Sequence, residues 1–126
     1  EPIEQRLKED PLVAEAVLIG DNRHFVSALI VPEFATVAAR TSLPAEIDPA
    51  TLVVRDDVRA LFETVIGHVN VELPRYEQIK YFELLPTEFS VASGELTPTL
   101  KVRRRVVVEK YQGVIEGLYR AASADR

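Results

Sequence analysis

The chain has 126 residues, 47% of them hydrophobic, which is enough for one compact domain with a buried core and too few for two full-sized ones. It contains no Cys, which excludes disulfides, zinc-thiolate sites and thiol catalysis and fits a reducing cytosol. Its formal net charge of −5 argues against a surface built throughout for nucleic acid.

Other classes are also disfavoured by the overall pattern. No apolar run approaches the roughly 18–20 residues that span a bilayer, and the N-terminus has no signal-peptide pattern. The chain has no Met and begins at Glu1-Pro2 inside a predicted helix. We therefore expect it to be a segment of a larger protein, the alternative being a trimmed or disordered start.

The first elements predict a helix followed by a β-hairpin. Pro2 suits the first turn of a helix, which Pro11 ends. Residues 13–19 and 24–31 are mostly apolar, and the turn residues 20–23 (Gly-Asp-Asn-Arg) separate them. Two apolar runs joined by such a turn indicate two antiparallel strands.

The middle of the chain predicts helices. A short helix is expected over 32–40, and residues 41–55 show no clear periodicity apart from Asp48, which can cap a short helix. Residues 56–73 give the clearest helical spacing of apolar side chains, with acidic residues at the start and Pro74 at the stop.

The last third predicts a strand over 79–85, a loop over 87–99 and one helix over 100–119, with fraying over 121–126. The order of these elements indicates a small α+β domain. Its sheet has about three strands, including the antiparallel hairpin, and amphipathic helices flank it.

The predicted start of the last helix is unusually basic, because Lys101 and residues 103–105 (Arg-Arg-Arg) lie in or beside its first turn. The helix dipole disfavours cations there by roughly 0.3–1 kcal/mol each. This pattern predicts a site that receives an anion, with the dipole and the side chains acting together. The alternative is a solvated basic face whose aliphatic stems cover the core.

Lys101 is the candidate that stands apart. It follows an irregular loop held by Pro98 and the flanking threonines, and a lysine is a compact point charge suited to developing negative charge. His24 and His68 are expected to be structural or solvent-facing, and there is no Gly-rich phosphate loop or carboxylate cluster at metal spacing. One cation without a nucleophile or a base indicates a contributor to an active site completed elsewhere.

The run GELTPTLKVRRRVVVEKY resembles the C-terminal signature of long-chain fatty acid–CoA ligases, which belong to the adenylate-forming (AMP-binding) superfamily. PIEQRL with VAEAVLIGDNRHFVSALIVP resembles the opening of that family's mobile C-terminal lid domain, and YEQIKYFELLPTEFS the approach to the signature. The resemblance covers almost all of residues 1–126 as a single lid domain. It is weakest across 35–55, where we expect an insert.

The resemblance implies a two-step reaction. A fatty acid and ATP give an acyl-adenylate and pyrophosphate, and CoA then displaces AMP to form the thioester. ATP and CoA are expected as substrates, with Mg²⁺ bound in the intact enzyme outside this chain. The chain's own large N-terminal adenylation domain is the expected partner, and both it and the hinge are expected to lie before Glu1, outside this chain. The isolated chain is therefore expected to be inactive, and the intact enzyme cytoplasmic or peripheral to a membrane.

The resemblance also assigns residues. Lys101 matches the catalytic lysine that enters the active site for adenylation and withdraws when the domain rotates for the thioester step. Arg104 matches the basic residue that follows it, with Thr99 and Arg103 as further candidates for binding substrate or phosphate. Leu100 stands where the superfamily often has Gly, although the long-chain branch commonly reads TPTLK.

Other uses of the basic residues are open at this point. Arg103 and Arg105 are candidates to meet phosphates, the partner domain or an anionic membrane surface, or to form a solvated helix face. Two alternatives remain for the whole chain. One is the lid domain of a fatty acyl-AMP ligase, and the other is a free-standing anion-binding or interaction module. Nucleic acid is not expected as a partner, because no aromatic residues are interleaved with the cations.

Overall fold

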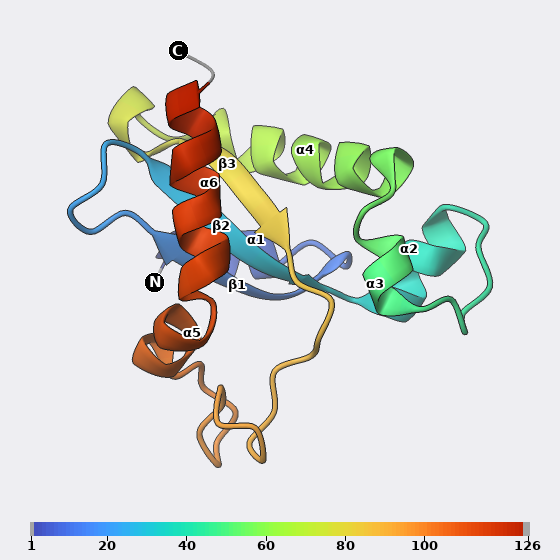
Figure 1. Cartoon of the computed structure of the whole chain (residues 1–126). Helices are drawn as coiled ribbons and strands as arrows, with labels where there is room; N and C mark the ends of the chain where they lie inside the picture. The colour runs from blue at the N-terminus through green and yellow to red at the C-terminus, as the bar shows by residue number, and fades with distance from the viewer. Residues whose placement is uncertain (1, 125–126) are drawn as a thin grey trace. The chain divides into compact units, whose positions relative to one another are not determined.

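A three-stranded mixed sheet organises the N-terminal part of the chain in the computed structural model, which describes residues 2–124 (Figure 1). The chain divides into two compact units, Glu1–Thr87, which holds the sheet, and Glu88–Arg126. The elements of the first unit are α1 (Pro2–Lys8), β1 (Val13–Ile19), β2 (Val26–Pro32), α2 (Phe34–Arg40), α3 (Pro49–Leu52), α4 (Asp56–Asn70), the 3₁₀ turn η1 (Arg75–Glu77) and β3 (Ile79–Leu84). The second unit holds α5 (Arg104–Lys110) and α6 (Gln112–Ala124).

The sheet has the order β1-β2-β3, with β1 and β2 antiparallel and β2 and β3 parallel. The predicted hairpin and the α+β class are therefore confirmed. The second strand starts at Val26 rather than at the predicted residue 24. Residues 20–25 are used by the turn, in which Arg23 donates its N–H to the Gly20 carbonyl at 3.1 Å. Because β2 and β3 run parallel, a crossover must join them, and α2, α3 and α4 form it.

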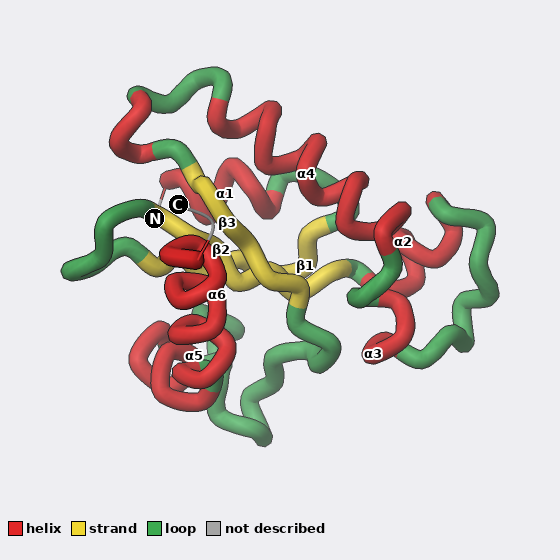
Figure 2. Tube along the Cα trace, turned by 45° about the horizontal axis from the view of Figure 1, so that its top comes forward, coloured by secondary structure: helices red, strands yellow, loops and turns green. Residues whose placement is uncertain are grey.

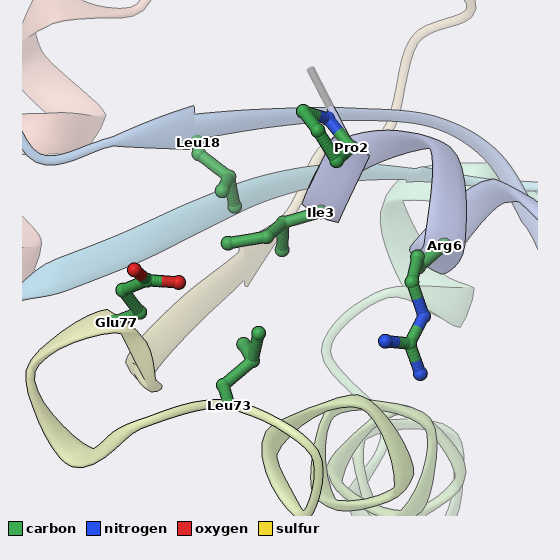
Figure 3. A pocket seen from close by; sticks show the side chains of 6 residues that line it. All are labelled: Pro2, Ile3, Arg6, Leu18, Leu73 and Glu77. Atoms are coloured by element: carbon green, nitrogen blue, oxygen red, sulfur yellow. The ribbon is translucent and has the colours of Figure 1, made fainter.

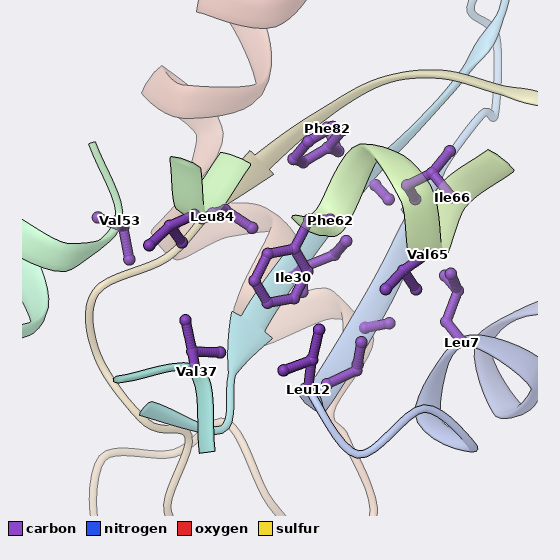
Figure 4. Packing of buried hydrophobic residues seen from close by; sticks show 14 of the residues in the cluster. Leu7, Leu12, Ile30, Val37, Val53, Phe62, Val65, Ile66, Phe82 and Leu84 are labelled. Carbon is purple, nitrogen blue, oxygen red and sulfur yellow. The ribbon is translucent and has the colours of Figure 1, made fainter. Parts of the chain in front are cut away.

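The core of the first unit lies between the sheet and α4. The helix buries Val58, Phe62, Val65, Ile66 and Val69, the stripe that its spacing predicts. Figure 4 shows Phe62 and Val65 pointing from α4 toward Ile30 of β2. Leu7 of α1 joins the same cluster, so α1 and α4 lie on one face of the sheet.

Polar contacts fix the helices to the strands. The Glu4 carboxylate in α1 accepts the N–H of Leu18 in β1 at 2.7 Å. At the end of α4, the Asn70 amide donates to the Ile79 carbonyl at 2.9 Å and accepts the Ile79 N–H at 2.8 Å. These bonds satisfy backbone groups at the edge of β1 and at the start of β3.

The prediction of one continuous helix over 100–119 is wrong. The helix begins at Arg104, is interrupted at Tyr111 and resumes as α6. Its predicted start fails because Leu100 has φ +66°, a left-handed conformation that an α-helix cannot contain. Fraying from 121 is also wrong up to Ala124, and residues 125 and 126 lie outside the described part of the chain.

Two statements about domain organisation stay predictions. One is that the two compact units act together as a single lid domain over residues 1–126. The other is the insert over 35–55, a range that includes most of α2 and all of α3.

Candidate functional site

A short β-hairpin presents Lys101. We call residues 95–103 the lysine hairpin; they lie in the irregular segment before α5, which Figure 2 draws as loop. Its antiparallel contacts are an isolated bridge between Leu96 and Val102, a hydrogen bond from the Thr97 N–H to the Lys101 carbonyl at 2.8 Å, and one from the Arg103 N–H to the Glu95 carbonyl at 2.7 Å.

The tip of the lysine hairpin is a three-residue loop, Pro98, Thr99 and Leu100. The Leu100 N–H donates to the Thr97 carbonyl at 2.7 Å, and Leu100 then takes φ +66°. A turn followed by one left-handed residue is a common three-residue hairpin loop, and Gly suits the last position because it has no Cβ. Leucine there adds strain of roughly 1–2 kcal/mol. This geometry gives a physical reason for the Gly that the superfamily often carries before the lysine.

Thr97 fixes the backbone at the lysine itself. Its hydroxyl oxygen accepts the Lys101 N–H at 3.0 Å and lies 3.2 Å from the Thr99 hydroxyl oxygen. The backbone of Lys101 is thus held by Thr97 through both its N–H and its carbonyl. Its side chain is exposed. The arrangement presents a flexible ammonium from a fixed base.

Below the hairpin lies a carboxylate that the sequence interpretation missed. Glu95 has an exposed fraction of 0%. One carboxylate oxygen accepts from the Ser90 N–H at 3.0 Å and from the Ser93 hydroxyl, and the other accepts from the Lys110 ammonium. Burial raises the pKa of Glu95, but the hydrogen bonds from Lys110, Ser93 and the Ser90 backbone lower it further, to about 2. The group is therefore ionised at neutral pH.

Lys110, whose side chain is 42% exposed, completes the network around Glu95 from the last turn of α5. Its hydrogen bond to Glu95 raises its pKa, against the smaller opposing effect of burial. No local pattern in the sequence marks Glu95, because its partners Ser90 and Lys110 lie five residues before and fifteen residues after it. Only the folded hairpin brings them together.

The predicted site residues divide into two groups. Thr99, Lys101 and Arg103 lie in the lysine hairpin, with Arg103 also the N-cap of α5, whereas Arg104 and Arg105 are the first two residues of α5. Lys101, predicted to lie in or beside the first turn where an irregular loop enters the helix, lies in that loop, two residues before the N-cap of α5. All five side chains are exposed.

Hollows of the first unit contain none of these residues. One, of about 290 Å³, is lined by Pro2, Ile3, Arg6, Leu18, Leu73 and Glu77, and Figure 3 shows Ile3, Leu18 and Leu73 pointing into the same space. Another, of about 340 Å³, includes the exposed His68. Within residues 2–124, no group of three or more His, Asp or Glu side chains is placed to hold a metal ion. Across the same residues, no helix is both long and apolar enough to cross a membrane.

Comparison with known proteins gives matches that cover nearly the whole chain. Residues 1–123 match the family model described as the AMP-binding enzyme C-terminal domain. The chain is 37% identical over 120 residues to the long-chain-fatty-acid–CoA ligase FadD15 of Mycobacterium tuberculosis, covering 93% of this chain and 20% of the relative. It is 32% identical over 142 residues to the human long-chain-fatty-acid–CoA ligase ACSBG1, covering 94% and 19%.

Solved structures give the same picture of the fold. The adenylation domain of a carboxylate reductase from Mycobacterium chelonae matches with a TM-score of 0.74 and 25% identity, over 93% of this chain and 17% of that one. In each of these comparisons the chain spans about a fifth or less of the protein that it matches.

Proposed function

Because this chain belongs to the family of AMP-binding enzyme C-terminal domains, we propose that it is the lid domain of a long-chain fatty acid–CoA ligase, in which Lys101 serves the adenylation step. The observation that carries the proposal is the lysine hairpin. It presents one exposed ammonium on a backbone fixed by Thr97, at the position that the family resemblance assigns to the lysine. The two relatives named above, both called long-chain-fatty-acid–CoA ligases, support the substrate class.

In the proposed first step, a fatty acid carboxylate oxygen attacks the α-phosphorus of ATP, and pyrophosphate leaves. Negative charge is concentrated between the carboxylate and phosphate oxygens as the new P–O bond forms. The protonated Lys101 stabilises that charge by hydrogen bonding to both groups, without gaining or losing a proton. In the second step, the CoA thiol loses its proton to solvent, its sulfur attacks the acyl carbonyl carbon, and the bond to AMP breaks, which gives the thioester and free AMP.

The chain supplies only part of this site. By our proposal, the binding sites for ATP and the fatty acid belong to an N-terminal adenylation domain of the same protein, as does the Mg²⁺ expected with ATP. This chain's role is to bring Lys101 in for adenylation and to rotate away for the thioester step. The intact enzyme is proposed to work in the cytoplasm or at a membrane surface, and the chain alone is proposed to be inactive.

The neighbouring residues have secondary roles in the proposal. Arg104, the first residue of α5, is proposed to contact phosphate oxygens when the hairpin is engaged. Thr99 and Arg103 flank Lys101 and are proposed as additional hydrogen-bond donors to the adenylate. Each of these side chains is exposed.

The test is substitution of Lys101 in the intact enzyme with the two half-reactions measured separately. Lys101→Ala is expected to lower adenylation, followed by pyrophosphate exchange, by at least about 10²–10³-fold, the range seen when one stabilising donor is removed. Thioester formation from supplied acyl-adenylate is expected to stay near wild type. Lys80→Ala, which removes another exposed lysine, is the control and should leave both steps unchanged. Normal adenylation in Lys101→Ala would contradict the proposal.

A further inference from the structure

We propose that Glu95 is a positioning residue for adenylation: its buried carboxylate, held by Ser90, Ser93 and Lys110, fixes the lysine hairpin that carries Lys101. This inference rests on the proposed role of Lys101. It adds a residue that makes no contact with substrate and acts only by placing the hairpin.

The backbone and the side chain of Glu95 contact different segments of the chain. Its carbonyl accepts the Arg103 N–H at 2.7 Å, which closes the base of the lysine hairpin just before α5 begins. Its carboxylate accepts from Ser90 and Ser93 in the preceding loop and from Lys110 at the far end of α5. One residue thus joins three segments of the second unit.

These contacts form a closed frame. The chain leaves the hairpin at Arg103, passes through the seven residues of α5, and returns to the start of the hairpin through the Lys110–Glu95 ion pair. We call this the glutamate frame, defined by Ser90, Ser93, Glu95 and Lys110. A closed frame of this kind limits how far the hairpin can rotate about its base.

Stability alone is a weak reason for such a group. Glu95 is fully buried although the Lys110 side chain is 42% exposed, and a carboxylate taken out of water for an ion pair seldom adds net stability over an apolar side chain of the same size. The ion pair and hydrogen bonds instead fix the orientation of the Glu95 side chain, and with it the hairpin, because all contacts of the carboxylate must be satisfied at once. Placement matters for a group like Lys101, because an error of about 1 Å at a reacting centre can reduce the rate about 10²-fold.

The strained tip of the hairpin supports this reading. Leu100 keeps φ +66° although it is not Gly. Strained backbone conformations persist where the surrounding contacts over-determine them and tend to occur at functional sites. The turn bond to Thr97 and the frame at the base of the hairpin supply those contacts.

The decisive experiment measures both half-reactions in the intact enzyme carrying Glu95→Gln, which keeps the shape and removes the charge. We expect kcat for adenylation to fall about 10–100-fold with the KM values for ATP and fatty acid unchanged. Thioester formation from supplied acyl-adenylate should stay within about twofold of wild type. Glu88→Gln, which changes an exposed glutamate in the same unit, is the matched control and should behave as wild type.

Three further variants change the groups that contact the Glu95 carboxylate. Lys110→Met keeps the aliphatic stem without the charge and should reproduce the loss in adenylation, whereas Lys110→Arg should restore at least half of the activity. Ser93→Ala removes one donor and should give a smaller loss, about threefold. If Glu95→Gln does not fold, these variants decide the question.

Two outcomes would overturn the inference. One is normal adenylation in Glu95→Gln or Lys110→Met. The other is an equal fall in both half-reactions that tracks a lower folded fraction by thermal unfolding, which would indicate a structural role only. Lys101→Ala, measured alongside, separates the two proposals. If it is impaired and Glu95→Gln is normal, only the frame is wrong; if it is normal, the proposed function fails first.

Discussion

Both compact units bury apolar side chains, but they differ in whether they also bury a charged group. The first unit packs an apolar stripe of α4 on the sheet, and Phe62, with an exposed fraction of 0%, lies at its centre. The second unit places a fully buried carboxylate, Glu95, under the hairpin that carries Lys101. Apolar burial is non-directional and tolerates small shifts, whereas a charged network fixes a direction. By the proposal above, the charged network serves the placement of the lysine hairpin, whereas apolar packing serves stability in both units.

The largest expected effect is a loss of stability in the first unit when a buried apolar side chain is removed. Phe62→Ala should lower the free energy of unfolding of the first unit by about 3–5 kcal/mol, because it removes a large buried side chain and leaves a cavity. Hydrogen exchange of the β1–β3 amides, read by mass spectrometry, measures the change. Exposed Val71, substituted by Ala, is the control and should have little effect. An equal rise in exchange at the lysine hairpin would show that the two units unfold together.

A smaller effect is expected in the second unit at low pH, where Glu95 becomes protonated. The pKa of Glu95 is about 2 in the folded chain, against an ordinary value of 4.5 for a glutamate. Because the folded pKa is the lower one, the ionised carboxylate contributes stability that is fully present above pH 4.5 and is lost as the pH falls toward 2. The loss amounts to at most about 3 kcal/mol.

The measurement is exchange of the Thr97 and Arg103 amides across that pH range, after correction for the intrinsic rate. Both amides donate within the lysine hairpin, so they should lose protection as Glu95 is protonated. Glu95→Gln should remove this pH dependence. Its persistence in that variant would assign the acid sensitivity to another group.

The smallest expected effect is on stability, when Leu100 at the tip of the lysine hairpin is substituted. Leu100→Gly should change the free energy of unfolding by less than about 1 kcal/mol, because relief of the left-handed strain is offset by the greater entropy of the unfolded chain. Leu100→Val should destabilise by about 1–2 kcal/mol, since a β-branched residue is poorly suited to φ +66°. Chemical denaturation of both variants checks the difference, and equal stabilities would contradict it.

The sequence predicted those parts of the fold that have a local pattern. The α4 stripe and the β1–β2 hairpin follow from periodicity and turn residues within a few positions, and both are confirmed. The helix start at residue 100 was wrong, because pairing of residues 95–97 with 101–103 competes with helix formation and leaves no mark in a short window.

The candidate site was predicted unevenly for the same reason. Lys101 could be singled out from its loop position and the family resemblance; the structure places it exposed on a hairpin, and its role toward a partner domain stays a prediction. Glu95 could not, because a carboxylate between Gly94 and Leu96 looks like any loop residue until Lys110 is brought beside it. Buried charge is a property of the tertiary fold.

The parallel pairing of β2 with β3 has a consequence for the order of folding. Strands β1 and β2 meet through a short turn, whereas Val26 of β2 pairs with Ile79 of β3, 53 residues further along. Closing so long a loop carries a large entropy loss before any contact is gained, so β3 is expected to join the sheet late. In kinetic terms, substitutions in β3 should mainly speed unfolding, while those in the β1–β2 hairpin should slow folding. Strand β3, which precedes the segment that carries Lys101, is then expected to be the last of the three strands to pair.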